Sequence, residues 1–189
     1  MLPDCADRLA RAPALSLEAD GAEADGARRY RVLRDKAYHL LARREHSAWE
    51  LRRKLTPMRG SHDADADAND ERVAAHVAEV QRMLDRLLAE LIEVGAQSDF
   101  RFAEHLCRWR YQNGRGPIKL RHDLTQHGIA EALIEQTMAQ YEAKWSALAA
   151  QVRCRKFGAS APSSYREWAK QARFLRQRGF AAEQIEPYA

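Results

Sequence analysis

The side chains that could do chemistry in this 189-residue chain are mainly arginines and lysines, and they gather in three sets. A guanidinium group presents a fork of N–H donors that can bind two oxygens of a phosphate or a carboxylate at once. This chemistry suits both polyanions and acidic protein surfaces, so the residue types do not choose between them. The expected partner-binding or DNA-binding residues are Arg43, Arg44, Arg52, Arg53 and Lys54, then Arg108, Arg110, Arg115, Lys119 and Arg121, and finally Arg153, Arg155, Lys156, Arg173, Arg176 and Arg178.

The formal net charge of +4 conceals blocks of opposite sign. Residues 61–100 hold ten acids and three bases, whereas residues 35–60 hold seven bases and three acids. Residues 101–128 hold six bases and two acids, and residues 151–189 hold eight and three. Basic blocks attract polyanions or acidic proteins through a field that salt weakens. Each block could instead be the solvated face of an amphipathic helix, and the sequence leaves that alternative open.

The histidines, cysteines and carboxylates form no recognisable catalytic set. No two histidines flank a glutamate at helical spacing, and the chain has neither a phosphate loop followed by lysine nor a Gly-x-Ser-x-Gly elbow. A calcium loop starting at Asp63 would need glycine and glutamate where the chain has Ala68 and Ala74. We therefore expect no enzymatic activity, no cofactor and no metal site.

The elements that must position the basic side chains are predicted to be helices. Only 14 residues are β-branched, whereas helix-forming residues are abundant. Leu124 and Gly128 recur as Leu175 and Gly179, each 51 residues later. An internal period of this length indicates stacked supersecondary units. The sequence therefore predicts an all-α fold with three tandem three-helix repeats in an elongated, curved arrangement.

Composition and breaks divide the chain into an extension and three units. Residues 1–27 lack periodicity and are expected to be a flexible extension. Repeat 1 is expected at residues 28–96 and includes an acidic loop at residues 61–70. Repeat 2 is expected at residues 97–142 and repeat 3 at residues 143–189.

Local signals predict where the helices begin and end. Ser47 with Glu50 forms a capping box sequence, and Ser98 is expected to cap the first helix of repeat 2. Pro117 suits a first helical position because its missing N–H has no partner there. Gly95 is expected to end the third helix of repeat 1.

The tryptophans lie at apolar helical positions. Trp109 stands between two arginines and could stack on a nucleic-acid base, but its spacing favours the core. The same interpretation applies to Trp49, Trp145 and Trp168. Ile118 is likewise expected to face inward.

The cysteines and the hydropathy indicate the compartment. Cys107 and Cys154 lie 47 residues apart at matched positions of two first helices and are expected to be small buried hydrophobes. With Cys5 they make an odd number, which argues for reduced thiols. No run approaches the roughly 20 apolar residues of a membrane helix, and no signal peptide pattern is present. We expect a soluble, cytoplasmic protein without membrane contact.

Two runs combine packing and turn residues in a specific order. The first run is Leu40, Ala42, Arg43, Arg44, Ser47, Glu50, Leu51, Lys54 and Leu55. The second run, within residues 98–134, is Asp99, Arg101, Phe102, Ala103, Gly116, Pro117, Leu120, Leu124, Gly128 and Ile129. In this order the chain resembles the RecX family, the bacterial modulators of the RecA recombinase, over residues 30–189. It departs from the family pattern between Leu55 and Leu84, where it is longer than in the other units by roughly twenty residues.

The resemblance implies a non-enzymatic regulatory protein of recombination, DNA repair and the SOS response. Such a protein binds the RecA–DNA filament and limits its extension, ATPase, strand exchange and co-protease activity, with weaker direct binding to single- or double-stranded DNA. We expect it to act as a monomer. Two alternatives stay open: a stand-alone helical-repeat DNA-binding protein, and a scaffold for another acidic protein.

Overall fold

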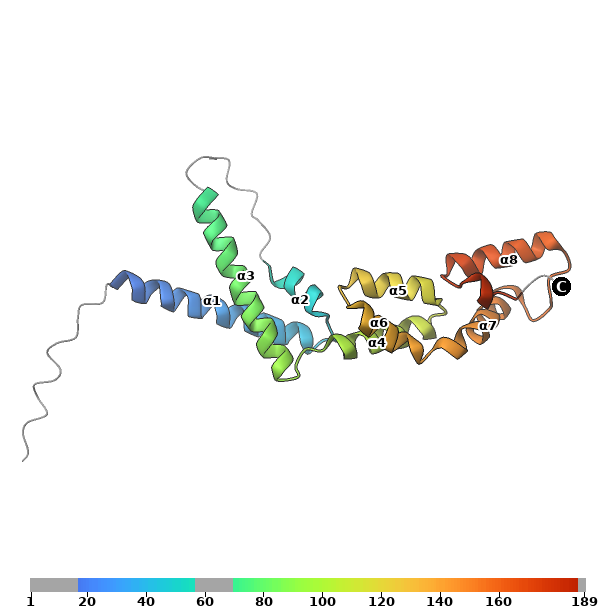
Figure 1. The fold of residues 1–189 in the computed structure, drawn as a ribbon, viewed down its shortest axis with the longest axis horizontal. Helices are drawn as coiled ribbons and strands as arrows, with labels where there is room; N and C mark the ends of the chain where they lie inside the picture. The colour runs from blue at the N-terminus through green and yellow to red at the C-terminus, as the bar shows by residue number, and fades with distance from the viewer. Residues whose placement is uncertain (1–16, 57–69, 187–189) are drawn as a thin grey trace, which may run out of the picture.

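The computed structural model describes residues 17–56 and 70–186, and within these ranges every regular element is a helix. The fold class predicted from the sequence is therefore confirmed. Figure 1 shows an elongated molecule in which the helices follow one another in groups from one end to the other. The acidic loop, apart from Asp70, and the first 16 residues lie outside the described residues.

Repeat 1 is made of α1 (Leu17–Leu41), α2 (Ala48–Leu55) and α3 (Asp70–Glu93), and the two long helices cross beside the short one (Figure 1). Its core is a separate apolar cluster drawn from all three helices. The buried members are Ala37, Leu51, Leu55, Val80, Leu84, Leu87, Leu88 and Leu91.

Helix α1 begins at Leu17, well before Arg28, where the apolar pattern starts. Residues 17–27 include four alanines and two glutamates, which favour a helix but supply no apolar stripe. Periodicity therefore detects only the packed part of this helix, and part of the predicted extension is helical.

Repeat 2 is made of α4 (Asp99–Gln112), α5 (Pro117–Gln126) and α6 (Glu131–Ala139). Helix α4 packs chiefly against α6, and α5 covers both. Ser98 caps α4 by accepting a hydrogen bond from a backbone N–H, and Pro117 is the first residue of α5, as predicted.

Repeat 3 is made of α7 (Trp145–Phe157), α8 (Tyr165–Gln177) and a final 3₁₀ turn (Ala182–Gln184). A short 3₁₀ turn (Glu142–Lys144) joins α6 to α7. Figure 1 shows α5 and α8 along one side of the molecule, with α4, α6 and α7 along the other.

Repeats 2 and 3 share one apolar cluster, which is distinct from the core of repeat 1. From repeat 2 it takes Leu120, Leu124 and Ile134, and from repeat 3 it takes Trp145 and Phe180, among others. Repeats 2 and 3 are thus joined by apolar burial, which is roughly proportional to the apolar area removed from water. The junction between repeats 1 and 2 has a different chemistry.

Candidate binding surface

The second helices of the three repeats, α2, α5 and α8, form what we call the second-helix row. The turn that ends one second helix meets the start of the second helix of the preceding repeat. His127 and Gly128, after α5, meet α2, whereas Arg178 and Gly179, after α8, meet α5. The 51-residue recurrence of these glycines is therefore the signature of a repeated contact between repeats.

The junction of repeats 2 and 3 is formed by backbone–backbone hydrogen bonds. The Gly116 N–H donates to the carbonyl of Arg178 (2.9 Å), and the Ile118 N–H donates to the carbonyl of Gly179 (3.0 Å). In addition, the Arg178 guanidinium group donates a hydrogen bond to the carbonyl of Asn113, at the end of α4 (3.1 Å). The first two bonds satisfy N–H groups at the start of α5 that have no partner within that helix.

Glycine is required on both sides of this junction. A Cβ on Gly116 would lie 2.3 Å from the carbonyl carbon of Gly179, closer than atoms can approach. Gly179 has a φ of 91°, and a Cβ there would lie 2.5 Å from the Cβ of Lys119. Only residues without a side chain permit this approach.

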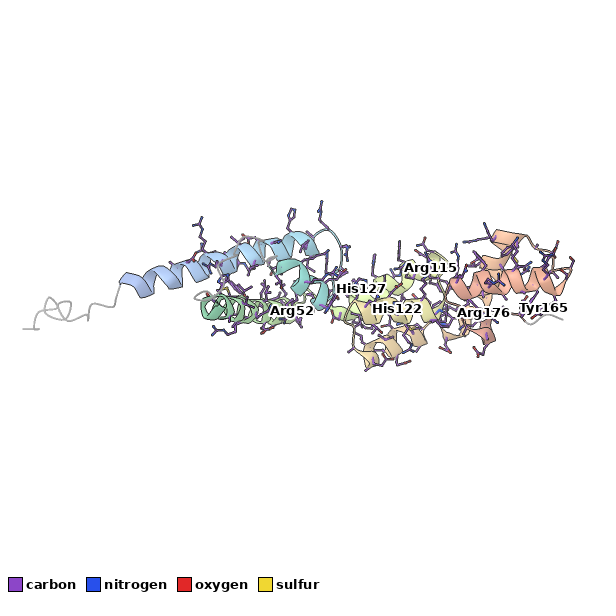
Figure 2. All side chains as sticks on the ribbon, turned by 90° about the horizontal axis from the view of Figure 1, so that it is seen from above. Arg52, Arg115, His122, His127, Tyr165 and Arg176 are labelled. Atoms are coloured by element: carbon purple, nitrogen blue, oxygen red, sulfur yellow. The ribbon has the colours of Figure 1, made fainter. Side chains whose placement is uncertain are left out.

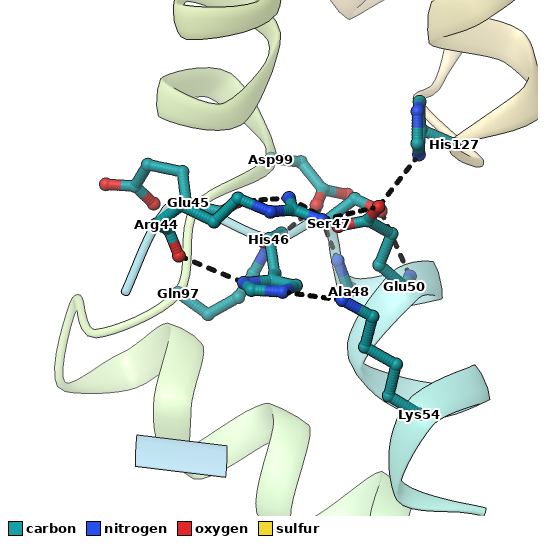
Figure 3. A network of polar contacts seen from close by, with 10 residues as sticks. All are labelled: Arg44, Glu45, His46, Ser47, Ala48, Glu50, Lys54, Gln97, Asp99 and His127. Carbon is teal, nitrogen blue, oxygen red and sulfur yellow. Dashed lines mark hydrogen bonds and ion pairs between the residues drawn. The ribbon is translucent and has the colours of Figure 1, made fainter. Parts of the chain in front are cut away.

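The junction of repeats 1 and 2 is built from side chains (Figure 3). The Glu50 carboxylate accepts two hydrogen bonds from Arg44 (2.9 and 3.2 Å) and lies 3.3 Å from Nδ1 of His127. Gly128 packs on Trp49, where a Cβ would lie 2.7 Å from the Trp49 Cβ. Glu50 therefore links the first repeat to the turn that ends α5.

A second carboxylate ties the same two repeats together (Figure 3). Oδ1 of Asp99 accepts from the Ala48 N–H at the start of α2 (2.8 Å) and from Nε2 of Gln97 (2.8 Å). Gln97 also donates to the carbonyl of His46 (3.2 Å). An anion is favourable at the start of a helix, where backbone N–H groups lack partners.

Burial and neighbouring charges shift the pKa values of two groups in this network. Burial lowers the pKa of His46, whose Nδ1 lies 2.9 Å from the Arg44 carbonyl and whose Nε2 lies 2.9 Å from Nζ of Lys54. Although burial alone would raise the pKa of Glu50, the hydrogen bonds and charge of Arg44, aided by His127, hold it below its ordinary value. The network therefore combines a neutral imidazole with an ionised carboxylate near neutral pH.

The structure divides the sixteen predicted basic residues into two groups. The members of the first group are already engaged inside the fold. Arg44 pairs with Glu50, Arg52 with Asp85, Arg110 with Asp123 and Arg121 with Glu131 and Glu135, whereas Lys54, Lys119, Arg153 and Arg178 contact neutral groups.

The second group is available to a partner. These side chains make no hydrogen bond or ion pair with any described residue. The Arg53 guanidinium group stacks on the Trp49 ring, 4.8 Å from the ring centroid. Its members are Arg43, Arg53, Arg108, Arg115, Arg155, Lys156, Arg173 and Arg176.

Two further bases on α8 belong with this group, although they lie outside the three basic sets predicted from the sequence. Arg166 and Lys170 are exposed and make no hydrogen bond or ion pair within the described part of the chain. Together with Arg173 they follow the i, i+4, i+7 spacing of one helix face, with Arg176 beside them. That spacing is the signal that would have identified them.

Viewed from above, the second-helix row faces the reader (Figure 2). The labelled residues Arg52, His122 and Arg176 belong to its three successive helices and lie along the length of the molecule. His122 is exposed, as is Lys119 in the preceding turn. The row therefore presents basic side chains from all three repeats.

The predicted burial of the tryptophans is right for Trp145, which is 1% exposed, and wrong for two others. Trp49 is 42% and Trp109 is 49% exposed, and each lies under a guanidinium group. The buried face of α4 centres on Ala103 and Cys107, whose small side chains carry little weight in a hydrophobic pattern. Trp109 is displaced to the edge of that face.

Ile118 is 59% exposed, contrary to expectation. Its helix begins with the backbone contact to Gly179, and this contact fixes the rotation of α5. Leu120 and Leu124 therefore take the core positions.

Cys107 is fully buried, and burial raises the pKa of its thiol to about 12, as expected of an inert core residue. Cys154 is only half-buried. The buried pair Leu148 and Ala149 matches Phe102 and Ala103 at an offset of 46 residues. This offset makes Arg153, and not Cys154, the counterpart of Cys107.

The described residues give no sign of a metal centre or a membrane span. Among them, no three histidine, cysteine or carboxylate side chains gather closely enough to hold a metal ion. No described helix has both the length and the apolar character needed to cross a membrane.

The stacked helices and the basic row define a class of protein, a helical-repeat protein with a surface suited to anionic partners. Comparison with known proteins then identifies the family. The model of the second three-helix domain of RecX matches residues 98–138, and that of the third three-helix domain of RecX matches residues 138–188.

Curated relatives extend the likeness along most of the chain. The regulatory protein RecX of Halorhodospira halophila is 37% identical over 84% of this chain and 86% of its own length. That of Stenotrophomonas maltophilia is 39% identical over 79% and 80%. The chain therefore belongs to the RecX family.

Solved structures agree with this fold. The crystal structure of RecX from Lactobacillus salivarius superposes with a TM-score of 0.61, at 18% identity, over 84% of this chain and 93% of that one. A second RecX crystal structure gives a TM-score of 0.67, at 18% identity, over 90% of this chain and 77% of that one.

Proposed function

We propose that this protein modulates RecA, chiefly as an inhibitor, by binding the RecA–DNA filament through the second-helix row. The observation that carries the proposal is the set of basic side chains on α8 that make no ion pair with any described residue, together with Arg53 on α2 and Arg115 in the turn before α5. A filament of protein on DNA presents acidic protein surface and phosphates along its whole length. A row of repeats can contact several such sites together, so modest individual contacts add up to firm binding.

Bound in this way, the protein would limit filament extension, ATP hydrolysis, strand exchange and co-protease activity. The row is long relative to one repeat, so a single molecule can contact more than one RecA protomer and hinder the addition of the next. Family membership supports the regulatory role. We further propose that the protein acts without catalysis, as a cytoplasmic monomer, with weaker direct binding to DNA.

The experiment is to add the protein at a small fraction of the RecA concentration and to follow filament extension on single-stranded DNA. The proposal predicts slowed extension together with reduced DNA-dependent ATPase activity. Direct DNA binding is measured in parallel at several salt concentrations.

The parallel measurement separates the alternatives. A stand-alone DNA-binding protein would act only at concentrations that coat free DNA, with log affinity falling against log salt at about 0.9 per neutralised phosphate. A scaffold for another acidic protein would leave both extension and DNA binding unchanged. Either result would overturn the proposal.

A further inference from the structure

A pocket opens inside repeat 3, on the face of α8 that is turned toward α7. Its volume is about 290 Å³, and its walls come from α7, α8, the loop between them and the C-terminal turn. Five alanines and Pro162 make most of the wall aliphatic, and Arg153 supplies a guanidinium group. The pocket lies on the opposite side of α8 from Arg173 and Arg176, which are exposed, so it is separate from the basic stripe of that helix.

Comparison of repeats 2 and 3 shows how the pocket arises. Gln171 and Gln184 lie 51 residues after Leu120 and Leu133, which pack in the core of repeat 2. Both glutamines line the pocket. These two positions are therefore apolar in repeat 2 and polar in repeat 3. A third position behaves in the same way, because Arg153 is the counterpart of Cys107.

The loop between α7 and α8 adds the rim. It is longer than the loop between α4 and α5, which is held against the turn after α8 by the Gly116 contact. Ala159 and Ala161 of the longer loop line the opening. A core that served only for stability would be filled by apolar side chains. Polar side chains at core positions, with small residues around the opening, are instead typical of a binding pocket.

The Arg153 guanidinium is only partly satisfied. Nη1 donates to the carbonyl of Ser160 (3.0 Å) and lies 3.5 Å from Oε1 of Gln171, and Nη2 contacts the Cys154 sulfur (3.3 Å). Nε is buried without a hydrogen-bond partner among the described residues. Glu186 also lines the pocket, but it makes no ion pair with Arg153, whose hydrogen bonds among the described residues all go to neutral groups.

We propose that this pocket binds a carboxylate attached to an apolar group, presented by an acidic partner protein. The carboxylate would pair with Arg153, and the apolar part would cover the alanines. An arginine binds carboxylates through parallel N–H donors, and burial strengthens that bond. The net positive charge of repeat 3 also favours an acidic partner protein, because residues 145–186 carry eight bases against three acids.

The test uses 3-phenylpropionate, a small probe that joins an aromatic ring to a carboxylate through a short flexible chain, titrated into the full chain. The Trp168 indole N–H, which donates to the Glu186 carbonyl (2.9 Å) at the pocket wall, reports binding by NMR. We expect a saturable shift, and about tenfold weaker binding of the neutral 3-phenylpropanamide.

Two variants locate the site, with a matched control. Arg153→Leu should weaken binding of 3-phenylpropionate about tenfold, because the ionic hydrogen bonds are lost. Gln171→Leu, which restores the residue type of repeat 2, removes the amide oxygen that lies 3.5 Å from Nη1 of Arg153. Without this contact to orient the guanidinium group, binding should weaken while the circular dichroism spectrum stays unchanged. Arg155→Leu removes the same charge from an exposed position of α7 and should leave binding unchanged.

Three results would overturn the proposal. These are equal binding of the amide and the acid, equal losses in Arg153→Leu and Arg155→Leu, and unchanged binding in Gln171→Leu. A 5′-phosphorylated oligonucleotide that displaced 3-phenylpropionate at lower concentration than an acidic peptide would assign the pocket to nucleic acid and overturn it as well.

Discussion

At the residue scale, Glu50 contributes both to the start of α2 and to the junction of repeats 1 and 2. The Ser47 hydroxyl accepts from the Glu50 N–H (3.1 Å), so half of the predicted capping box is present. The Glu50 carboxylate is instead directed to Arg44 and His127. The sequence pattern contains the bond from the Glu50 N–H to Ser47, whereas His127, one of the two partners of the Glu50 carboxylate, lies 77 positions along the chain.

Removing the Glu50 carboxylate should weaken the junction of repeats 1 and 2. Glu50→Ala leaves Arg44 and His127 without their shared anion, and we expect the free energy of unfolding to fall by about 2 kcal/mol. This value is below that of a fully buried pair because the Arg44 side chain is 47% exposed. Urea unfolding measures the change. Glu93→Ala, at an exposed position that makes no ion pair with the described residues, is the control, and an equal loss in both variants would contradict this role.

His46 should make stability depend on pH. Its pKa in the folded protein lies below the ordinary value of 6.5, so the unfolded chain binds more protons as the pH falls below 6.5. The stability that His46 contributes is therefore complete above this pH and is lost as the pH falls toward the folded pKa. Glu50 has a pKa below its ordinary 4.5 and loses its contribution only at lower pH.

Urea unfolding at several pH values between about 7 and 5 measures this dependence. We expect stability to decrease across the range in the natural protein and to decrease less in His46→Asn. An equally steep decrease in the variant would show that other groups are responsible.

At the scale of elements, the sequence predicted the helices well and their rotations less well. Gly95, Gly128 and Gly179 end their helices with positive φ, and Pro117 begins α5, because these effects depend on local backbone geometry. Which face of a helix is buried depends on its neighbours. Trp109 is exposed because Ala103 and Cys107 form the contact face of α4, and no local pattern reveals that.

Gly116 tests the contact that sets the rotation of α5. Its φ of −80° suits alanine, so Gly116→Ala isolates the effect of close approach to Gly179 from backbone strain. We expect the free energy of unfolding to fall by about 3 kcal/mol, since overpacking forces the backbones apart. Thermal unfolding gives the measurement. Gly26→Ala, where the added Cβ meets Met83 at an ordinary 3.7 Å inside α1, should be neutral or stabilising.

A similar loss of stability in both glycine variants would show that the Gly116–Gly179 approach is not a tight contact. If Gly116→Ala kept the stability of the natural protein, that result would also show that the two glycines are not in tight contact. In either case the 51-residue recurrence would need another explanation.

At the scale of the whole molecule, the internal recurrence predicted the stacking of repeats, and the two runs of packing and turn residues predicted the family. It did not distinguish structural from available basic residues. The ion pair of Arg52 with Asp85 joins α2 to α3, and that of Arg101 with Glu45 joins two repeats. Such pairs depend on how distant segments pack, so half of the predicted basic residues are engaged inside the fold while the bases of α8 remain available.

The central claim is that the second-helix row binds the RecA–DNA filament, and a pair of charge-reversal variants tests it most directly. Arg173→Glu with Arg176→Glu reverses two available bases on α8. Arg31→Glu with Lys36→Glu makes the same charge change at exposed positions of α1 that have no ion-pair partner among the described residues. The measurement is the protein concentration that halves the rate of RecA filament extension on single-stranded DNA. The account predicts an increase of about tenfold or more for the α8 variant and little change for the α1 variant. Equal concentrations for both variants would contradict it.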